Sequence, residues 1–172
     1  DRFEKQLEEF SNNPSLMICG SHIIEFVGTP QNIKARRCVP LDDEQIRRSG
    51  KWRNPFNHMT VMFRKSKILE VGSYEPCLLM EDYVLWAKVL QSKSGVVKNI
   101  DDYLVYARAG DGLMERRGGV SYLKKYIVGK RRMMELGYIN SFQYVFSILS
   151  QLVVSTLPLN IRGLVFAKFL RR

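Results

Sequence analysis

GSYEPCLLMEDYVLWAKV, at residues 72–89, is the stretch from which both the fold and the chemistry of this chain can be worked out. It holds a Gly and a Pro typical of a loop, then two adjacent carboxylates, Glu81 and Asp82, and then an almost unbroken apolar run. Acidic residues are common in the first turn of a helix because the helix dipole stabilises negative charge there. The stretch therefore predicts a helix over residues 82–91 with the acidic pair at its entrance.

On both sides of this helix the hydrophobic pattern alternates between helical and strand-like, which predicts an α/β fold. Phe3, Leu7 and Phe10 recur at helical spacing and predict a helix over residues 2–12, whereas residues 16–27 are mainly apolar and predict a buried strand or hairpin. Further helices are predicted over residues 42–48, 65–71 and 120–136, and further strands over residues 60–63, 96–100 and 103–106. The last two strands are separated by a turn at Asp101 and Asp102, the rest of residues 31–57 is polar and irregular, and four glycines make residues 109–119 a mobile loop.

Composition places the chain among globular proteins with an anionic partner. Its 172 residues make one domain or part of one, and 45% hydrophobic residues can bury a core. The net charge of +10 favours a membrane surface, a nucleic acid or a phosphorylated substrate as partner. The three cysteines match no zinc or disulfide pattern, which favours a reducing compartment. The chain begins at Asp1, has no signal peptide and lacks an initiator Met, so we expect it to be a piece of a longer protein.

The C-terminal segment has a different character from the rest. Residues 136–161 contain no charged side chain, and basic residues precede and follow them. Polar residues nevertheless recur roughly on one helical face, at Gln143, Ser147, Ser150, Gln151 and Ser155. This pattern favours an amphipathic helix that lies in a membrane interface over a helix that spans the bilayer. The alternative is a core helix packed on the domain.

Several motifs follow one another in order between residues 57 and 108. They are Asn57-His58, VMFR at 61–64, VGSYE at 71–75, EDYVLW at 81–86, Asn99-Ile100 and YLVYAR at 103–108. This ordered set resembles the C-terminal half of the family 2 inverting glycosyltransferases, enzymes of the GT-A type that build bacterial surface polysaccharides. The start of the chain, RFEKQ at 2–6, is similar to the segment that follows the Asp-x-Asp metal motif of that family. The resemblance thus covers residues 1–110.

The resemblance implies roles for four residues. Asp82 matches the general base that takes the proton of the acceptor hydroxyl, while Glu81 would orient the acceptor and His58 and Trp86 would line its site. The residues alone leave other roles open. The acidic pair can serve only the helix dipole, His58 can be a packed or capping residue, and Trp86, one turn after Asp82, can pack in the core.

The donor side of the reaction is represented weakly in this chain. Arg116 and Arg117 lie among glycines and could close over the donor diphosphate, although a solvated loop explains them equally simply. No histidines and carboxylates show metal-ligand spacing, so we expect no metal on this chain. The resemblance implies a divalent metal, Mg or Mn, in the full-length enzyme. It also places the nucleotide-binding half before Asp1, so we expect the chain alone to be inactive.

Taken together, these patterns predict a partial GT-A domain, Rossmann-like with a mixed sheet, over residues 1–110. A flexible loop and basic helix (111–135) and an amphipathic, membrane-associated tail (136–172) follow as a helical extension. The expected partners are a nucleotide-sugar donor, a saccharide or lipid-linked acceptor and an anionic membrane, met at the cytoplasmic, inner face of the cell membrane. The alternative is a non-enzymatic basic module that binds a membrane or a partner. Nucleic acid is not expected, because the aromatic residues lie in apolar runs and no nucleic-acid motif is present.

Overall fold

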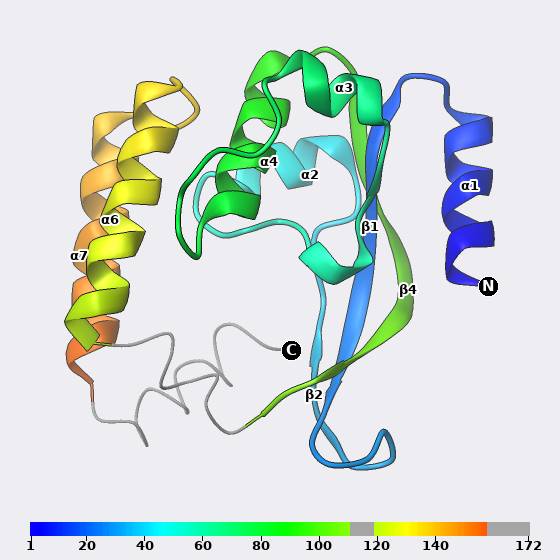
Figure 1. The fold of residues 1–172 in the computed structure, drawn as a ribbon, viewed down its shortest axis with the longest axis horizontal. Helices are drawn as coiled ribbons and strands as arrows, with labels where there is room; N and C mark the ends of the chain where they lie inside the picture. The colour runs from blue at the N-terminus through cyan, green and yellow to red at the C-terminus, as the bar shows by residue number, and fades with distance from the viewer. Residues whose placement is uncertain (111–118, 158–172) are drawn as a thin grey trace.

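The computed structural model describes residues 1–110 and 119–157, and within them it shows an α/β domain with a helical C-terminal extension (Figure 1). The predicted fold class is confirmed. The elements, in chain order, are α1 (Arg2–Asn12), β1 (Leu16–Phe26), β2 (Ile33–Arg37), α2 (Asp43–Ser49), the 3-10 turn η1 (His58–Thr60), β3 (Met62–Phe63), α3 (Lys65–Glu70), α4 (Glu81–Ser92), β4 (Val96–Arg108), α6 (Gly119–Glu135) and α7 (Ser141–Thr156).

β1 is the centre of a mixed four-stranded sheet. β4 runs parallel to it along its whole length, while β3 and β2 pair antiparallel with its first and second halves. With neighbours on both edges and helices on both faces, every residue of β1 is buried. This explains why the strand reads as a mainly apolar run instead of an alternating pattern.

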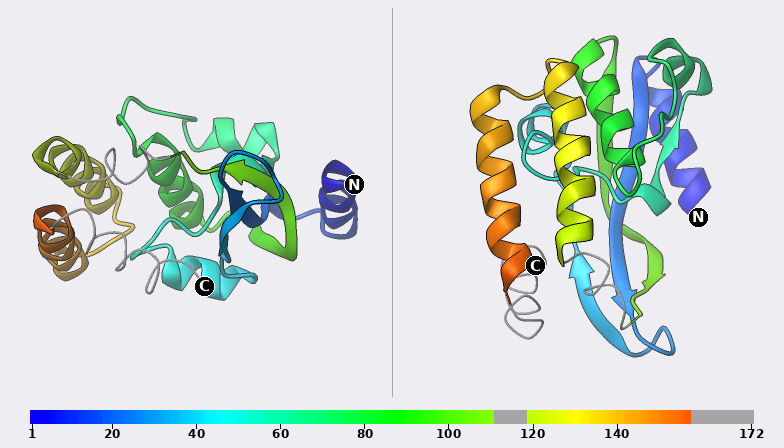
Figure 2. Two further views of the ribbon diagram at one scale, coloured as in Figure 1. Left: turned by 90° about the horizontal axis from the view of Figure 1, so that it is seen from below. Right: turned by 60° about the vertical axis from the view of Figure 1, so that its left-hand side comes forward.

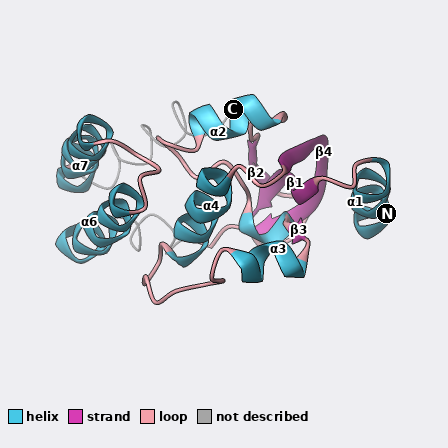
Figure 3. Ribbon diagram, turned by 90° about the horizontal axis from the view of Figure 1, so that it is seen from above, coloured by secondary structure: helices cyan, strands magenta, loops and turns pink. Residues whose placement is uncertain are grey.

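The elements form layers that can be followed in Figure 3. α1 covers one face of the sheet and α4 lies on the other, with α6 and α7 beyond it (Figures 2 and 3). α1 is fixed by the buried Gln6, whose Nε2 donates 2.8 Å hydrogen bonds to the carbonyls of Cys19 and Thr60. On the opposite face, α4 buries Val84, Trp86 and most of its other side chains against the sheet.

Three strand predictions are wrong in detail. Residues 96–108 form one strand, because the register shifts at Ser21 and His22 of β1 leave room for Asp101 and Asp102 within β4. Residues 31–57, predicted to be irregular apart from a short helix, also contain β2, which forms a hairpin with β1. The strand predicted over 60–63 is limited to β3, since His58–Thr60 form the 3-10 turn before it.

The helical extension packs on the domain through α6. Gly129 of α6 lies against Met80, and a Cβ at this position would stand 2.7 Å from the Met80 side chain, so glycine allows this close approach. α7 packs side by side with α6, and the two helices together form the outermost layer (Figure 2). Within the described residues, no helix is long and apolar enough to cross a membrane. The predicted mobile loop, with Arg116 and Arg117, lies outside the described residues at 111–118.

Candidate active site

The acidic pair lies at the N-terminus of α4, as the sequence predicted. Glu81 is the first helical residue and is exposed, whereas Asp82 is half-buried. The Asp82 carboxylate accepts one hydrogen bond at each oxygen: Oδ1 from the backbone N–H of Tyr83 at 2.8 Å, and Oδ2 from the side-chain amide of Asn54 at 2.8 Å. Each oxygen has two lone pairs, so each keeps one for a further donor.

Asn54 orients the Asp82 carboxylate, and sequence reasoning did not identify it. It lies in the segment between α2 and η1, 28 residues from Asp82 along the chain. Its Oδ1 accepts the backbone N–H of Phe56 at 3.2 Å, so its Nδ2 is the end of the amide that faces Asp82. Asn57, which the motif comparison singled out, lies instead in the core, where its Nδ2 donates to the carbonyl of Ser21 at 2.9 Å.

His58, Tyr74 and Trp86 form an aromatic group near the acidic pair. The His58 Nε2 lies 3.3 Å from the Tyr74 hydroxyl, and the His58 ring meets the Trp86 ring edge-on at a centroid distance of 6.0 Å. Burial, followed by the negative charges of Asp82 and Glu81, raises the pKa of Tyr74, which shows that its hydroxyl shares their electrostatic environment. Tyr74 is therefore a second site residue that the sequence analysis did not single out.

Trp86 itself is fully buried, between Phe56 and His58. A ring without exposed surface cannot stack on a sugar in this conformation. Its position fits the core-packing alternative, in which the buried Trp86 ring packs against the ring of the exposed His58.

The loop between α3 and α4 has an unusual backbone. Gly72, Ser73 and Leu79 all have positive φ angles, of 85°, 54° and 68°. Gly72 follows α3 as predicted, and glycine adopts this conformation without cost. Ser73 and Leu79 do not, and backbone strain of this kind is concentrated at functional sites. Leu79 lies two residues before Glu81, the first residue of α4.

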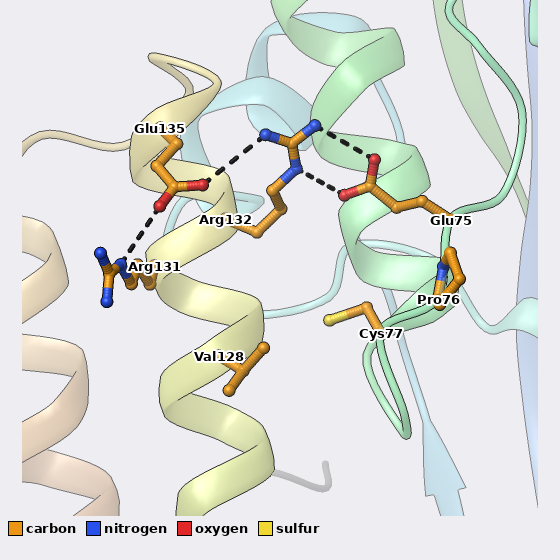
Figure 4. A pocket seen from close by; sticks show the side chains of 7 residues that line it. All are labelled: Glu75, Pro76, Cys77, Val128, Arg131, Arg132 and Glu135. Carbon is orange, nitrogen blue, oxygen red and sulfur yellow. Dashed lines mark hydrogen bonds and ion pairs between the residues drawn. The ribbon is translucent and has the colours of Figure 1, made fainter.

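Glu75, from the VGSYE motif, holds this loop against two helices. Its carboxylate accepts hydrogen bonds from Arg132 of α6 at 2.6 and 3.2 Å (Figure 4). It also forms a 2.8 Å ion pair with Lys88 of α4. The hydrogen bond with Arg132, assisted by Lys88, lowers the pKa of Glu75 to about 2. The motif glutamate is thus a structural anchor for the loop that leads to Asp82.

A buried lysine connects α6 to the residue after Asp82. Lys130 donates to the Tyr83 hydroxyl at 3.2 Å and to the Lys51 carbonyl at 3.1 Å, and its ammonium lies 4.6 Å from the centre of the Tyr83 ring. Tyr83 in turn donates to the Gly50 carbonyl at 2.7 Å. Burial lowers the pKa of Lys130 to about 7. These bonds join α6, the start of α4 and the segment that carries Asn54.

Two surface hollows lie away from Asp82. One, of about 410 Å³, is formed by the 75–77 loop and α6 and is shown in Figure 4. The other, of about 510 Å³, lies between α2 and Gln143 of α7. In residues 1–110 and 119–157, no three or more His, Cys, Asp or Glu side chains converge as metal ligands would.

The comparison with known proteins points to one class of enzyme. No family model matches the chain. The chain is 38% identical to the amylovoran biosynthesis glycosyltransferase AmsE of Erwinia amylovora over 128 residues, which are 74% of this chain and 47% of that protein. The chain is similar in sequence to glycosyltransferases. An uncharacterized glycosyltransferase of Haemophilus influenzae is 42% identical over 124 residues, which are 72% of this chain and 45% of that protein.

A third relative matches the chain over its whole length. It is the UDP-Gal:alpha-D-GlcNAc-diphosphoundecaprenol beta-1,3-galactosyltransferase of Escherichia coli, 33% identical over 172 residues, which are 100% of this chain and 62% of that protein. The chain thus spans about half to two thirds of the length of the curated relatives it matches. The glycosyltransferase resemblance noted from the motifs is supported, and its match extends through the helical extension.

Proposed function

We propose that this chain is the acceptor-side part of a family 2 inverting glycosyltransferase of the GT-A type, with Asp82 as its general base. The observation that carries the proposal is the Asp82 carboxylate: it is fixed at both oxygens, lies at a helix N-terminus and keeps a free lone pair on each oxygen. A general base needs this combination of a defined orientation and an available acceptor.

The proposed reaction moves one sugar and one proton. The acceptor hydroxyl oxygen bonds to the anomeric carbon of a nucleotide sugar, the bond from that carbon to the diphosphate oxygen breaks, and the hydroxyl proton passes to Asp82. Attack from the face opposite the leaving diphosphate inverts the anomeric configuration. Exposed Glu81, together with His58 and Tyr74, would hold the acceptor through its other hydroxyls.

The donor side of the site is proposed from the family resemblance alone. A divalent metal, Mg or Mn, would neutralise the leaving diphosphate, although the described residues offer no ligand cluster for it. Arg116 and Arg117, which lie outside the described residues, remain candidates to bind the diphosphate.

The acceptor is proposed to be a saccharide, either free or carried on a lipid diphosphate. The name of the E. coli relative specifies a diphosphoundecaprenol-linked acceptor for that protein, and the name of AmsE specifies polysaccharide biosynthesis. A net charge of +10 favours binding to an anionic membrane surface, which we propose to be the inner face of the cell membrane.

The product stereochemistry tests this proposal. The full-length protein is incubated with α-configured nucleotide sugars and a saccharide acceptor, and the anomeric proton coupling of the product is measured by NMR. A β-linked product supports the proposal. An α-linked product would contradict inversion, and binding of the sugars without any turnover would favour a non-enzymatic module.

A further inference from the structure

α7 carries a stripe of exposed apolar side chains along one face. The stripe consists of six residues spaced as one face of a helix requires: Phe142, Val145, Phe146, Leu149, Leu152 and Val153. Phe142 is 70% exposed and Val153 is 60% exposed. From Phe142 to Val153 the stripe spans most of the length of α7.

The side of α7 turned inward carries small polar as well as apolar residues. Ser147 is buried there, and Ile148 and Val154 are half-buried, whereas Ser150 is exposed. Tyr144 packs against the core cluster, and Gln151 is half-buried and donates to Ser155 within the helix. A surface helix in water normally buries its apolar face. Here the six large apolar side chains of the stripe are exposed instead.

The surroundings of the stripe carry positive charge and an interfacial aromatic. Trp52, 43% exposed, meets Phe146 edge-on at 5.7 Å, and tryptophan is enriched where protein meets the boundary of a bilayer. Arg48 and Lys51 lie beside Trp52, with Asp43 and Glu44 as the neighbouring acids. After residue 118 the sequence has a single acid, Glu135. Its basic residues include the exposed Lys124 and, later in the sequence, Arg162, Lys168, Arg171 and Arg172, whereas Lys130 is buried and Arg132 is held by Glu75.

We infer that the α7 stripe inserts into the interface of an anionic membrane, with the helix lying parallel to the surface. This deepens the proposed function by naming the surface that meets the membrane, and it rests only on the membrane part of that proposal. The absence of charge between residues 136 and 161 lets the stripe enter the headgroup region, while basic residues on both sides of it bind anionic headgroups.

The size of the stripe argues for lipid over a second copy of the chain. A stable protein interface uses about 20–30 residues on each side, whereas the stripe offers six from a single helix. A lipid surface has no such requirement, since an interfacial helix binds through a narrow apolar face flanked by charge. A second copy, or another part of a longer chain, is then an outcome that the experiment must detect.

The experiment measures how much full-length protein sediments with vesicles of phosphatidylglycerol and phosphatidylethanolamine. Leu149→Glu puts a charge in the middle of the stripe. Leu69→Glu is the matched control, because Leu69 is 58% exposed on α3 and Leu149 is 56% exposed on α7. We expect Leu149→Glu to weaken vesicle binding about tenfold or more and Leu69→Glu to leave it within twofold of wild type.

A second measurement does not depend on how well a charged variant folds. Val153→Cys and Leu69→Cys, each in a Cys38→Ser background and labelled with an environment-sensitive fluorophore, are mixed with the same vesicles. A blue shift at position 153 and none at 69 is the expected result. No shift at 153, or vesicle binding that Leu149→Glu leaves unchanged, overturns the inference, as does a wild-type dimer that Leu149→Glu converts to monomers.

These outcomes separate the two proposals. If high salt abolishes vesicle binding of the wild type and Leu149→Glu does not weaken it, the membrane part of the proposed function stands and insertion of the stripe is refuted. Transfer to a soluble acceptor without any vesicle binding would keep the chemistry at Asp82 and refute both membrane statements.

Discussion

Asn54→Ala tests whether the amide of Asn54 holds the Asp82 carboxylate in its working orientation. The variant loses the 2.8 Å hydrogen bond from Asn54 Nδ2 to Asp82 Oδ2. A hydrogen bond to a charged group contributes about 1.5–3 kcal/mol, or roughly 10- to 150-fold in rate. Asn54 is half-buried, so water can partly replace its amide, and we expect the low end of this range. The turnover number should fall about tenfold, with little change in the KM of the donor.

The assay is steady-state transfer by the full-length protein, with Asn32→Ala as the control. Asn32 is exposed in the turn between β1 and β2, far along the sheet from α4. Loss of the Asn54 bond to the Phe56 N–H lowers stability by about 1 kcal/mol, a Tm shift of about 2–4 °C. In an Asp82→Asn background, Asn54→Ala should cost no further turnover, because the two residues act as a unit. Wild-type turnover for Asn54→Ala, or an equal loss in both backgrounds, would refute the positioning role.

Two predictions concern stability and its dependence on pH. The pKa of Glu75 is lowered from 4.5 to about 2, so the stability it contributes is complete above pH 4.5 and is lost as the pH falls toward 2. Because Arg132 is 42% exposed and screened by solvent, Glu75→Gln should lower the free energy of unfolding by about 1–2 kcal/mol at pH 7 and weaken its fall between pH 4.5 and 2, measured by urea unfolding. An unchanged fall in that range would argue against the anchor. The pKa of Lys130 is lowered from 10.5 to about 7, so the unfolded chain binds more protons than the folded one between these values and stability should rise with pH across that window. Lys130→Met should remove this rise of at most a few kcal/mol, and parallel unfolding curves for variant and wild type between pH 7 and 10 would contradict it.

The helices and the central strand could be predicted because each has a local signal. α1 and α4 show the apolar spacing and acidic first turn of a helix, and β1 is a mainly apolar run because the sheet surrounds it. β4 was divided wrongly at Asp101 and Asp102, two residues that normally favour turns. The strand continues because both carboxylates find partners: Asp101 contacts His22 Nε2 at 3.1 Å, and Asp102 contacts Lys5 Nζ at 2.5 Å.

The candidate site could be predicted only in part. Asp82 and Glu81 stand out because they are adjacent and precede an apolar helix. Asn54 gives no such signal, since its contact with Asp82 joins segments 28 residues apart and depends on the path of an irregular loop. Tyr74 lies within a recognised motif, but only the fold brings its hydroxyl to His58. The outward position of the α7 stripe was also beyond the sequence pattern, which defines two faces of the helix but not which of them meets the domain.

The most direct test of the account is transfer by Asp82→Asn in the full-length protein. The substitution keeps the size of the side chain and its ability to accept a hydrogen bond but removes the proton acceptor. We expect turnover to fall roughly 100-fold or more, donor binding measured by calorimetry to stay within about twofold, and Glu81→Gln to affect mainly the KM of the acceptor. Turnover of Asp82→Asn within a few fold of wild type would rule out Asp82 as the general base.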